Sequence, residues 1–452
     1  MVPSKIAAKL SSLVWRLLTR YGRIKYRYLL PVYRLFGLLP DSPRSIGTGR
    51  PSATLRAAAA IVSALDRSAL GAYAEQLKVL HERVRFSKGA VIFLPSVGWD
   101  ILNTQRPHHL AREFARQGHV SIFDVNNAFD DVAGFKEIES NVFLFRGDPG
   151  ILRSIRDPII WALTYNFERA TEYSLTGSVV YDWIDELEIF PYQESFLKSN
   201  HARALREATI VVSVARRLHD RALALRPDAL YLPNAVEERL IGADSVPPDD
   251  SDILLLSREG KPVAGYIGAL AEWFDYELLE SLARLRTDWT FLLIGPNYDL
   301  SLNRRGRSLL GLPNVRWIGH RPYASLKAYL SVFDVALIPF VINDITMATS
   351  PLKLYEYFAA GKPVIVTRLP ECLAFSEVFD VGNVEEFSRA LDLARLKGRD
   401  MSFVEGLLDL ARKNSWTARV RVLLEHLNNH PETQKRPRSV TLANGAPRTQ
   451  DF

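Results

Sequence analysis

The stretch TSPLKLYEYFAAGKP, residues 349–363, carries the most complete set of helix start and stop signals in the sequence. Ser350 is a preferred N-cap residue, and Pro351 suits the first position of a helix, because its missing N–H would be unpaired there in any case. Gly361 suits the left-handed position after a helix, and the proline two residues later cannot continue one. The stretch therefore predicts a helix over residues 351–360.

The apolar run DVALIPF, residues 334–340, precedes this helix and is typical of a buried strand. In an open α/β sheet such a helix begins at the edge where ligands bind, and its free N–H groups and dipole attract anions. Lys353 adds a positive charge suited to a diphosphate. Glu356 shares a face with Lys353, and its carboxylate could accept hydrogen bonds from both hydroxyls of a ribose. The alternative interpretation is an ordinary Lys–Glu pair on a helix surface.

Short apolar runs alternate with helix-like stretches along most of the chain. We expect a first set of strands at 90–96, 120–126, 141–147, 158–165, 178–185, 208–215 and 229–236, and a second set at 263–270, 289–295, 314–320, 334–340 and 362–369. Apolar strands that alternate with helices predict parallel sheets covered on both faces. The fold class is therefore α/β, with two Rossmann-like, doubly wound domains that face a cleft.

Changes in composition divide the chain into five parts. The predicted parts are a basic segment 1–40, a linker and helical extension 41–87, an N-terminal Rossmann-like domain 88–245, a C-terminal Rossmann-like domain 246–430 and a polar tail 431–452. The proline-rich stretch 242–262 is expected to be the hinge between the domains. The last long helix, about 402–428, is the element that could pack back on the first domain.

These segments together resemble GT-B glycosyltransferases, especially family 4-like enzymes of bacterial surface-polysaccharide assembly. In the helix segment the matching residues are Pro351, Lys353, Glu356, Tyr357, Ala360, Gly361, Pro363 and Val364. Other matching segments are 99–111, 118–120, 181–186, 232–236, 265–268, 293–296, 312–319 and 334–339. The resemblance covers residues 88–430 and rests on the order and spacing of these pieces rather than on any single one.

The resemblance implies a nucleotide-sugar donor site in the second domain. There the lysine contacts the donor phosphates and the glutamate contacts the ribose, and the expected donor-binding residues are Gly268, Ser350, Pro351, Lys353, Tyr355 and Glu356. Many retaining members carry another glutamate eight positions before this one, with seven residues between the two, where this chain has Ala348. This departure leaves inversion or retention, the donor sugar and the strength of the activity open. Asp275 is interpreted as an acid at a helix N-terminus rather than as a catalyst.

In GT-B enzymes the N-terminal domain generally binds the acceptor, whose hydroxyl must lose a proton as it attacks. Asp185 lies at the end of the predicted strand 178–185 and is the first candidate for the general base, the alternative being that it caps a turn. His108 is a second candidate. Trp99, Asp100, Arg106 and His109 are expected to bind the acceptor, with Arg106 suited to an acceptor phosphate. The alternative for the histidines and Arg106 is a structural role at a helix start.

Metal and cofactor chemistry are not expected. Asp250 and Asp252 form an Asp-x-Asp pair, but no strand precedes them, so a metal role is disfavoured. The chain lacks a Walker loop and a Gly-x-Gly-x-x-Gly motif. Its single cysteine, Cys372, excludes an internal disulfide framework.

Positive charge is concentrated at the N-terminus. The formal net charge is +6, and residues 1–40 contain eight Lys and Arg residues but no acid, so the rest of the chain is mildly acidic. At helical periodicity these cations gather on one arc beside an apolar arc, which favours an amphipathic helix on an anionic membrane surface. The alternative is a helix docked on the protein with a solvated basic face. Nucleic acid is disfavoured as a partner because the body of the chain is not basic.

The function predicted from the sequence is transfer of a hexose-type sugar from a nucleotide-diphosphate sugar to a glycan or lipid-linked acceptor in polysaccharide biosynthesis. The expected location is cytoplasmic, on the inner face of the plasma membrane. Two alternatives are kept. One is a non-catalytic nucleotide-sugar-binding or scaffold subunit, which Ala348 favours, and the other is a nucleotide-sugar epimerase on the same fold.

Overall fold

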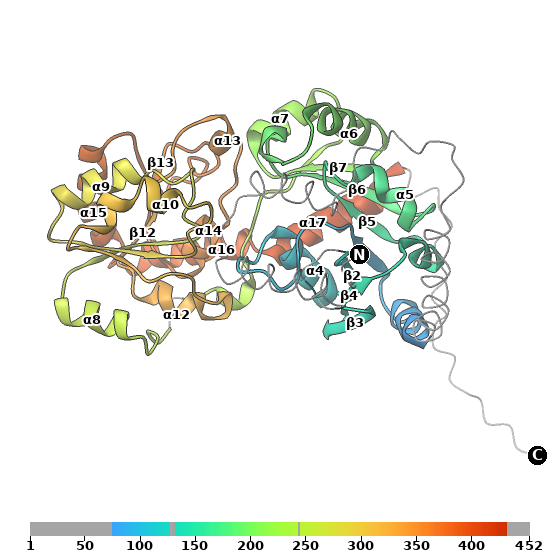
Figure 1. Ribbon diagram of the computed structural model, residues 1–452, viewed down its shortest axis with the longest axis horizontal. Coiled ribbons are helices and arrows are strands. Elements are labelled where there is room, and N and C mark those ends of the chain that lie inside the picture. Colours follow the sequence, from blue (N-terminus) through green and yellow to red (C-terminus); the bar gives the residue numbers. More distant parts are fainter. Residues whose placement is uncertain (1–74, 127–129, 131, 243–244, 432–452) are drawn as a thin grey trace, which may run out of the picture.

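The computed structural model describes residues 75–126, 130, 132–242 and 245–431, which form two α/β domains joined side by side (Figure 1). The predicted basic segment 1–40, most of the extension 41–87 and nearly all of the tail 431–452 lie outside the described residues. A helix over residues 75–85 precedes the first strand.

The first domain is built on an eight-stranded sheet with the order β3-β4-β2-β1-β5-β6-β7-β8. Its strands are β1 (Ala90–Phe93), β2 (Val120–Asp124), β3 (Gly134–Glu139), β4 (Val142–Arg146), β5 (Ile159–Ala162), β6 (Ser178–Trp183), β7 (Ile210–Ser213) and β8 (Leu230–Tyr231). All neighbours are parallel except β3 and β4. The edge strand β3 was not predicted, because its sequence GFKEIE is largely charged and exposed and lacks the continuous apolar run of the inner strands.

Helices cover both faces of this sheet. They are α4 (Arg106–Arg116), α5 (Ala170–Tyr173), α6 (Glu194–Glu207) and α7 (Arg216–Leu223), with shorter turns η1 (Pro149–Ser154), η2 (Phe167–Arg169), η3 (Leu187–Ile189) and η4 (Glu238–Leu240). The central strands are buried along their whole length, which explains why their sequences are continuous apolar runs.

The second domain is built on a six-stranded, all-parallel sheet with the order β11-β10-β9-β12-β13-β14. Its strands are β9 (Val263–Ile267), β10 (Thr290–Ile294), β11 (Val315–Trp317), β12 (Val335–Ile338), β13 (Val364–Thr367) and β14 (Phe379–Val381). The short edge strand β14 was not predicted. The predicted fold class of two parallel-sheet Rossmann-like domains is confirmed.

The helices of the second domain surround this sheet. They are α8 (Ser251–Glu259), α9 (Tyr276–Leu285), α10 (Ser301–Arg304), α11 (Arg307–Leu310), η5 (Tyr323–Ser325), α12 (Leu326–Ser331), α13 (Asp344–Met347), α14 (Leu352–Ala359), α15 (Val384–Lys397) and α16 (Met401–Lys413). The stretch 242–262 is therefore not a plain hinge, because α8 occupies its second half. Asp250 caps α8 and also binds Arg321 and Tyr329, so this carboxylate is used by the protein itself.

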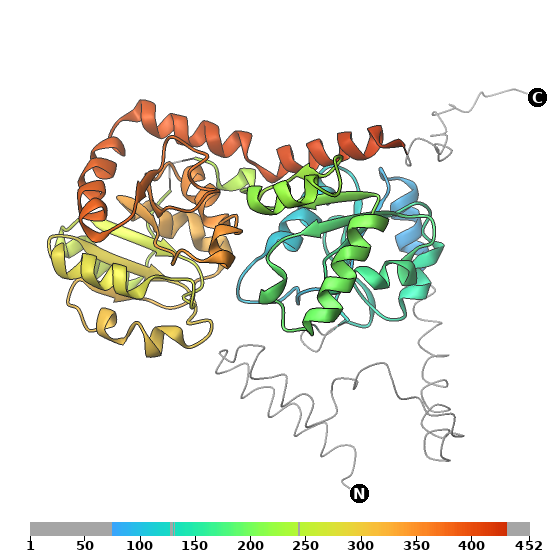
Figure 2. The same cartoon turned by 90° about the horizontal axis from the view of Figure 1, so that it is seen from above.

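The chain crosses between the domains twice, and the two crossings pair with each other. The amide of Val236 donates to the carbonyl of Asn414 (3.1 Å), and the amide of Trp416 donates to the carbonyl of Val236 (2.9 Å). The single helix predicted over 402–428 is wrong: α16 ends on the second domain and α17 (Trp416–Asn429) begins anew, capped by Ser415. Helix α17 then packs on α4 of the first domain. Figure 2 shows the C-terminal helices, drawn in red, passing from the second domain to the first.

Candidate functional site at the start of helix α14

Helix α14 begins at the interface between the domains. It starts at Leu352 with Pro351 at the N-cap, one residue later than the sequence predicted. Ser350 is displaced from the capping position because it holds the first domain: its carbonyl accepts from the side-chain amide of Asn234 (2.7 Å), and its hydroxyl accepts from the Asn234 backbone N–H (3.3 Å). The helix ends at Ala359, one residue earlier than predicted, and Gly361 takes the left-handed conformation at φ 63°.

Lys353 lies against the loop that follows strand β9. A Cβ placed on Gly268 would lie only 2.7 Å from the Lys353 Cε, and Gly268 adopts φ 151°, a conformation that other residues rarely accept. The ammonium group stands 4.9 Å from the ring centre of Phe340 and 5.4 Å from that of Tyr266. Within the described residues no carboxylate forms an ion pair with it, so the cation remains available to an anionic ligand.

Glu356 is buried one turn after Lys353. Burial raises the pKa of its carboxyl group to about 7, although the charge of Lys353 and a hydrogen bond from the Tyr323 hydroxyl both lower it. Burial also lowers the pKa of Lys353 to about 8, although the nearby Glu356 raises it. Two ionisable groups with pKa values moved toward neutrality, side by side at a domain interface, are typical of a ligand site.

Tyr355 and Tyr357 are buried and support the helix rather than line an open surface. The Tyr357 hydroxyl accepts a hydrogen bond from the Ile267 amide (2.9 Å), which fixes α14 against the end of β9. Burial raises the pKa of Tyr355 to about 12, while Ser350 and Arg419 of α17 beside it lower that pKa. Tyr355 therefore connects the helix start to the second domain crossing, which is a positioning role.

Ala348, at the position of the missing glutamate, has no exposed surface and packs into the apolar core of the first domain with Tyr181 and Trp183. A carboxylate at this position would be buried among apolar groups, which costs free energy unless it is paired. The absence of the glutamate therefore agrees with the packing between the two domains.

The start of helix α4 is a buried polar junction. Arg106 is 5% exposed and donates from Nε and Nη2 to the Asp182 carboxylate (2.8 and 3.2 Å), and Nη1 donates to Asn234 Oδ1 (3.2 Å). Trp161 also donates to Asp182 (3.1 Å). Arg106 thus joins α4 to the end of β6 and to the residue that holds Ser350, and this arrangement argues against the predicted role in binding an acceptor phosphate.

His108 and His109 are both 1% exposed. His108 Nδ1 accepts from the Gln105 amide (3.1 Å), so Nε2 carries the proton that is donated to the Gly98 carbonyl (2.9 Å). Both ring nitrogens are therefore engaged by the backbone, which argues against the predicted catalytic role of His108. His109 Nδ1 instead lies 2.8 Å from the carboxylate of Glu237.

The loop with Trp99 and Asp100 is held from behind by Asp130, whose carboxylate accepts from both backbone amides at 2.9 Å. The Trp99 ring is partly exposed, and the guanidinium of Arg112 lies 4.8 Å from its centre. The Asp100 side chain is exposed. Both residues thus stay available to a ligand, and their acceptor role remains a prediction.

Asp185 follows the end of β6 and is half-buried. Burial and the nearby charges of Glu186 and Asp182 raise the pKa of its carboxyl group to about 7. Its neighbour Glu186 pairs with Arg217 (3.7 Å), and Arg217 pairs with Asp344 of the second domain (2.8 Å). Asp185 therefore lies on the segment that faces the loop leading into α14.

Tyr323, Glu237 and Arg239 were missed by the sequence interpretation. They come together only in the folded chain, from η5 and from the crossing around η4, and no local motif marks them. A Pro-Tyr pair, and a glutamate and an arginine in a linker, look like ordinary surface residues. Among the described residues, no cluster of three or more His, Cys, Asp or Glu is arranged to hold a metal ion.

Two parallel-sheet domains joined by a double crossing, with a buried Lys–Glu pair at the helix start between them, define the GT-B fold of glycosyltransferases. The GT-B fold that the sequence resemblance implied is confirmed. Residues 261–393 match the family model of glycosyl transferases group 1. No helix among the described residues is long and apolar enough to cross a membrane.

The chain is similar to a Bacillus subtilis (strain 168) protein assigned to teichuronic acid biosynthesis as the glycosyltransferase TuaH, with 29% identity over 247 residues. That match covers 52% of this chain and 60% of the relative's length. Sucrose-phosphate synthase from Thermosynechococcus elongatus shares the fold with a TM-score of 0.57 and 14% identity, over 75% of this chain and 98% of that chain. The Anabaena protein HepE in complex with UDP-glucose shares the fold with a TM-score of 0.55 and 17% identity, over 75% of this chain and 99% of that chain.

Proposed function

We propose that this chain is a glycosyltransferase that binds a nucleotide-diphosphate sugar at the start of α14 and transfers a hexose-type sugar to a glycan or lipid-linked acceptor. The observation that carries the proposal is the position of Lys353, a cation without a carboxylate partner among the described residues, beside Gly268 and one turn before Glu356. The relative assigned to teichuronic acid biosynthesis supports a role in polysaccharide assembly. The HepE complex supports a nucleotide sugar as donor.

Each part of the donor has a group suited to it. The Lys353 ammonium and the N-terminal amides of α14 neutralise the diphosphate, which gains charge as it leaves. Gly268, with no side chain, lets a phosphate approach the backbone closely. The Glu356 carboxylate accepts hydrogen bonds from the ribose hydroxyls in its ionised form.

Asp185 is the proposed general base. The acceptor hydroxyl attacks the anomeric carbon, the bond from that carbon to the diphosphate oxygen breaks, and the hydroxyl proton passes to the Asp185 carboxylate. A pKa of about 7 suits this task, because a substantial fraction of the group is ionised near neutral pH and the carboxylate is basic enough to accept the proton. His108 is not retained as a catalyst, since both of its ring nitrogens are occupied.

The experiment is a nucleotide-sugar consumption assay with membrane extract as the acceptor source, run on the full chain and on Lys353→Met. The methionine keeps the length of the side chain but removes the charge, so turnover should fall at least about ten-fold, as expected for a lost charge-assisted hydrogen bond. Lys362→Met is the matched control. Lys362 lies just before β13 and donates to the Ser331 carbonyl, so it is not part of the proposed donor site. Equal turnover in Lys353→Met and the unaltered chain would contradict the proposed donor site.

A non-catalytic subunit that binds nucleotide sugars is the second candidate, favoured by the alanine at position 348. It would bind the donor without consuming it across a panel of donors and acceptors. An epimerase would interconvert nucleotide sugars in the absence of any acceptor. The same assay, run with and without extract, separates these outcomes from glycosyl transfer.

We also propose that residues 1–40 hold the protein on the inner, cytoplasmic face of the plasma membrane, where a lipid-linked acceptor would lie. The support is the charge pattern of the segment, with eight basic residues and no acid. Basic amphipathic segments gain affinity for anionic lipids from each Lys or Arg near the surface.

A further inference from the structure

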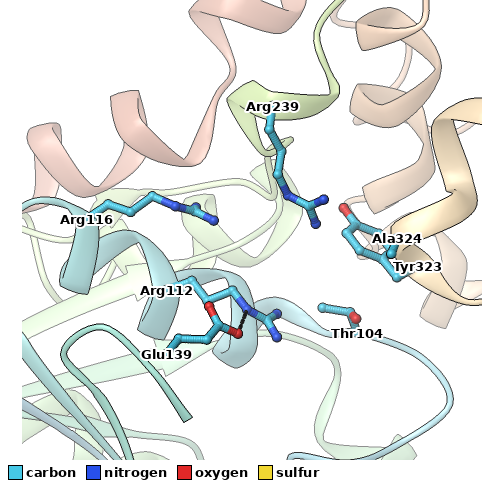
Figure 3. Close-up of a pocket in the computed structure, with 7 residues that line it drawn as sticks. All are labelled: Thr104, Arg112, Arg116, Glu139, Arg239, Tyr323 and Ala324. Atoms are coloured by element: carbon cyan, nitrogen blue, oxygen red, sulfur yellow. Dashed lines mark hydrogen bonds and ion pairs between the residues drawn. The ribbon is translucent and has the colours of Figure 1, made fainter. Parts of the chain in front are cut away.

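A pocket of about 280 Å³ lies between the two domains, apart from Lys353. It is lined by residues of α4 and the loop before it, β3, the η4 crossing and η5: Thr104, Arg112, Arg116, Glu139, Arg239, Tyr323 and Ala324. Figure 3 shows three arginine side chains directed into the same space, Arg112 and Arg116 from α4 and Arg239 from η4, with Glu139 as the one acid among the lining residues.

The carboxylates that hold these arginines occupy only part of their donor groups. Arg112 donates from Nε to Glu139 (2.8 Å), and Arg239 donates from Nε to Glu237 (2.5 Å). The terminal amino groups of Arg112 and Arg239 form no hydrogen bond with the described residues. Each guanidinium thus keeps two N–H-bearing nitrogens for a ligand, in the planar arrangement that matches the oxygens of a phosphate.

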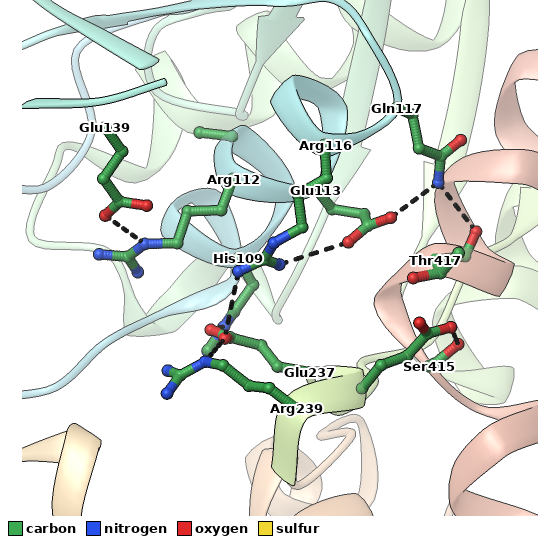
Figure 4. Close-up of polar contacts among 12 residues, drawn as sticks. His109, Arg112, Glu113, Arg116, Gln117, Glu139, Glu237, Arg239, Ser415 and Thr417 are labelled. Carbon is green, nitrogen blue, oxygen red and sulfur yellow. Dashed lines mark hydrogen bonds and ion pairs between the residues drawn. The ribbon is translucent and has the colours of Figure 1, made fainter. Parts of the chain in front are cut away.

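Glu237 anchors this arrangement from behind. It is fully buried and accepts hydrogen bonds from His109 (2.8 Å) and Arg239, while Arg116 lies 3.6 Å away (Figure 4). Burial would raise the pKa of Glu237, but the hydrogen bonds from His109 and Arg239 outweigh it and hold the pKa at about 2. Glu237 therefore stays ionised and fixes two of the arginines while remaining outside the lining of the pocket.

The pocket adjoins the proposed donor site through one side chain. Tyr323 lines the pocket, its ring centre lies 5.3 Å from that of His109, and it is near enough to Glu356 to lower the pKa of that carboxyl group. The pocket volume suits a small anionic group rather than a whole nucleotide sugar. A ligand held by Arg112 and Arg239 would contact the first domain and the crossing together, beside the tyrosine of the second domain.

We propose that this interdomain pocket is a second anion site that binds a phosphate or diphosphate group through Arg112, Arg116 and Arg239. Two sources could supply the group: the phosphate of an acceptor, which rests on the proposed transferase function, or a free phosphorylated metabolite that favours closure of the domains. The binding itself is independent of that function.

The probe is inorganic pyrophosphate, titrated by calorimetry into the full chain and its variants. The Lys353→Met variant removes the charge of the donor site, so binding that persists in it reports the pocket. Arg112→Gln combined with Arg239→Gln should weaken that binding at least about ten-fold. Arg203→Gln is the matched control, because Arg203 forms an exposed pair with Glu207 on α6, outside the pocket.

The Glu139→Gln variant shows whether a loss of binding in the double arginine variant reflects the pocket or a failure to fold. This change removes the negative charge from the pocket lining, so pyrophosphate should bind more tightly. Because the Glu139 side chain is 43% exposed, the expected gain in affinity is that of a charge at the protein surface, about three-fold or more. A loss of structure could not produce such a gain. The proposal is overturned if pyrophosphate does not bind, if binding disappears with Lys353→Met alone, or if the double arginine variant binds as the unaltered chain does.

The source is distinguished in the consumption assay, with extract used before and after phosphatase treatment. An acceptor phosphate predicts that the double arginine variant raises the KM for untreated extract only. A free metabolite predicts that added pyrophosphate changes turnover of the unaltered chain but not of the double variant. If nucleotide sugar is not consumed at all, the proposed function fails, while the calorimetric result for the pocket stands.

Discussion

At the scale of single residues, Glu356, Lys353 and Asp185 share one property: burial moves the pKa of each toward neutrality. The sequence could nominate all three, because a lysine and a glutamate one turn apart at a capped helix start, and an acid after a strand, are visible as patterns. It could not reveal that both nitrogens of His108 are occupied or that Arg106 is paired with Asp182, since those partners come from distant parts of the chain.

The pH dependence of kcat/KM for the donor follows from these shifts. Glu356 accepts ribose hydroxyls only when ionised, so kcat/KM should rise as the pH increases toward about 7. Lys353 holds phosphate only when protonated, so kcat/KM should fall again above about 8. In Lys353→Arg, whose guanidinium stays charged, the fall above 8 should move to higher pH. A flat profile across this range would contradict the assignment of both groups.

Asp185→Asn tests the proposed base. The amide cannot accept the proton, so kcat should fall by about 10²–10⁴-fold, the usual contribution of general base catalysis, while donor affinity is unchanged. Glu188→Gln is the control, an exposed acid in the turn that follows. Steady-state kinetics with a saturating donor separate the two effects, and a kcat that matches the control would remove Asp185 from the mechanism.

At the scale of elements, helix α14 was predicted to within one residue because both of its ends carry strong local signals. Edge strands β3 and β14 and the break between α16 and α17 were missed. Their causes are tertiary: β3 pairs with β4 despite a charged sequence, and α17 restarts because Ser415 and Trp416 pair with the other crossing at Val236. Local sequence propensity cannot predict such tertiary partners.

Asp275 provides a test at this scale. Its carboxylate accepts from the Leu278 amide (2.9 Å) and caps α9, which agrees with its interpretation as a helix acid. Asp275→Ala should lower the free energy of unfolding by about 1 kcal/mol, while Asp275→Asn, which can still cap, should lower it much less. Denaturant melts measure both. A large loss of turnover in the folded asparagine variant would assign Asp275 a catalytic role instead.

At the scale of the whole molecule, two crossings that pair with each other join the domains, and α17 returns the end of the described chain to the first domain. Contacts such as those of Asn234 with Ser350, and of Tyr231 with Glu371, hold the start of α14 and the loop after β13 against that domain. The proposed donor site is therefore a property of the assembled pair of domains. Parallel sheets were predictable from apolar runs, but the residues that join them were not.

The concentration of positive charge in residues 1–40 leads to a prediction about the full chain. Removal of these residues should abolish sedimentation with anionic lipid vesicles, because the remaining chain has no net positive charge. The thermal midpoint of the remaining domains should stay unchanged. Vesicles of neutral lipid are the control, and equal binding to anionic vesicles before and after truncation would refute the membrane role.

The most direct measurement of the central claim is a calorimetric titration of nucleotide-diphosphate sugars into Glu356→Gln and into the unaltered chain. Glutamine has the same shape but lacks the charge that accepts the ribose hydroxyls, so affinity for the bound donor should fall about ten-fold or more. Glu377→Gln, a partly exposed acid of the same domain, should bind as the unaltered chain does. Equal donor affinity in Glu356→Gln and the control would contradict a donor site at the start of α14.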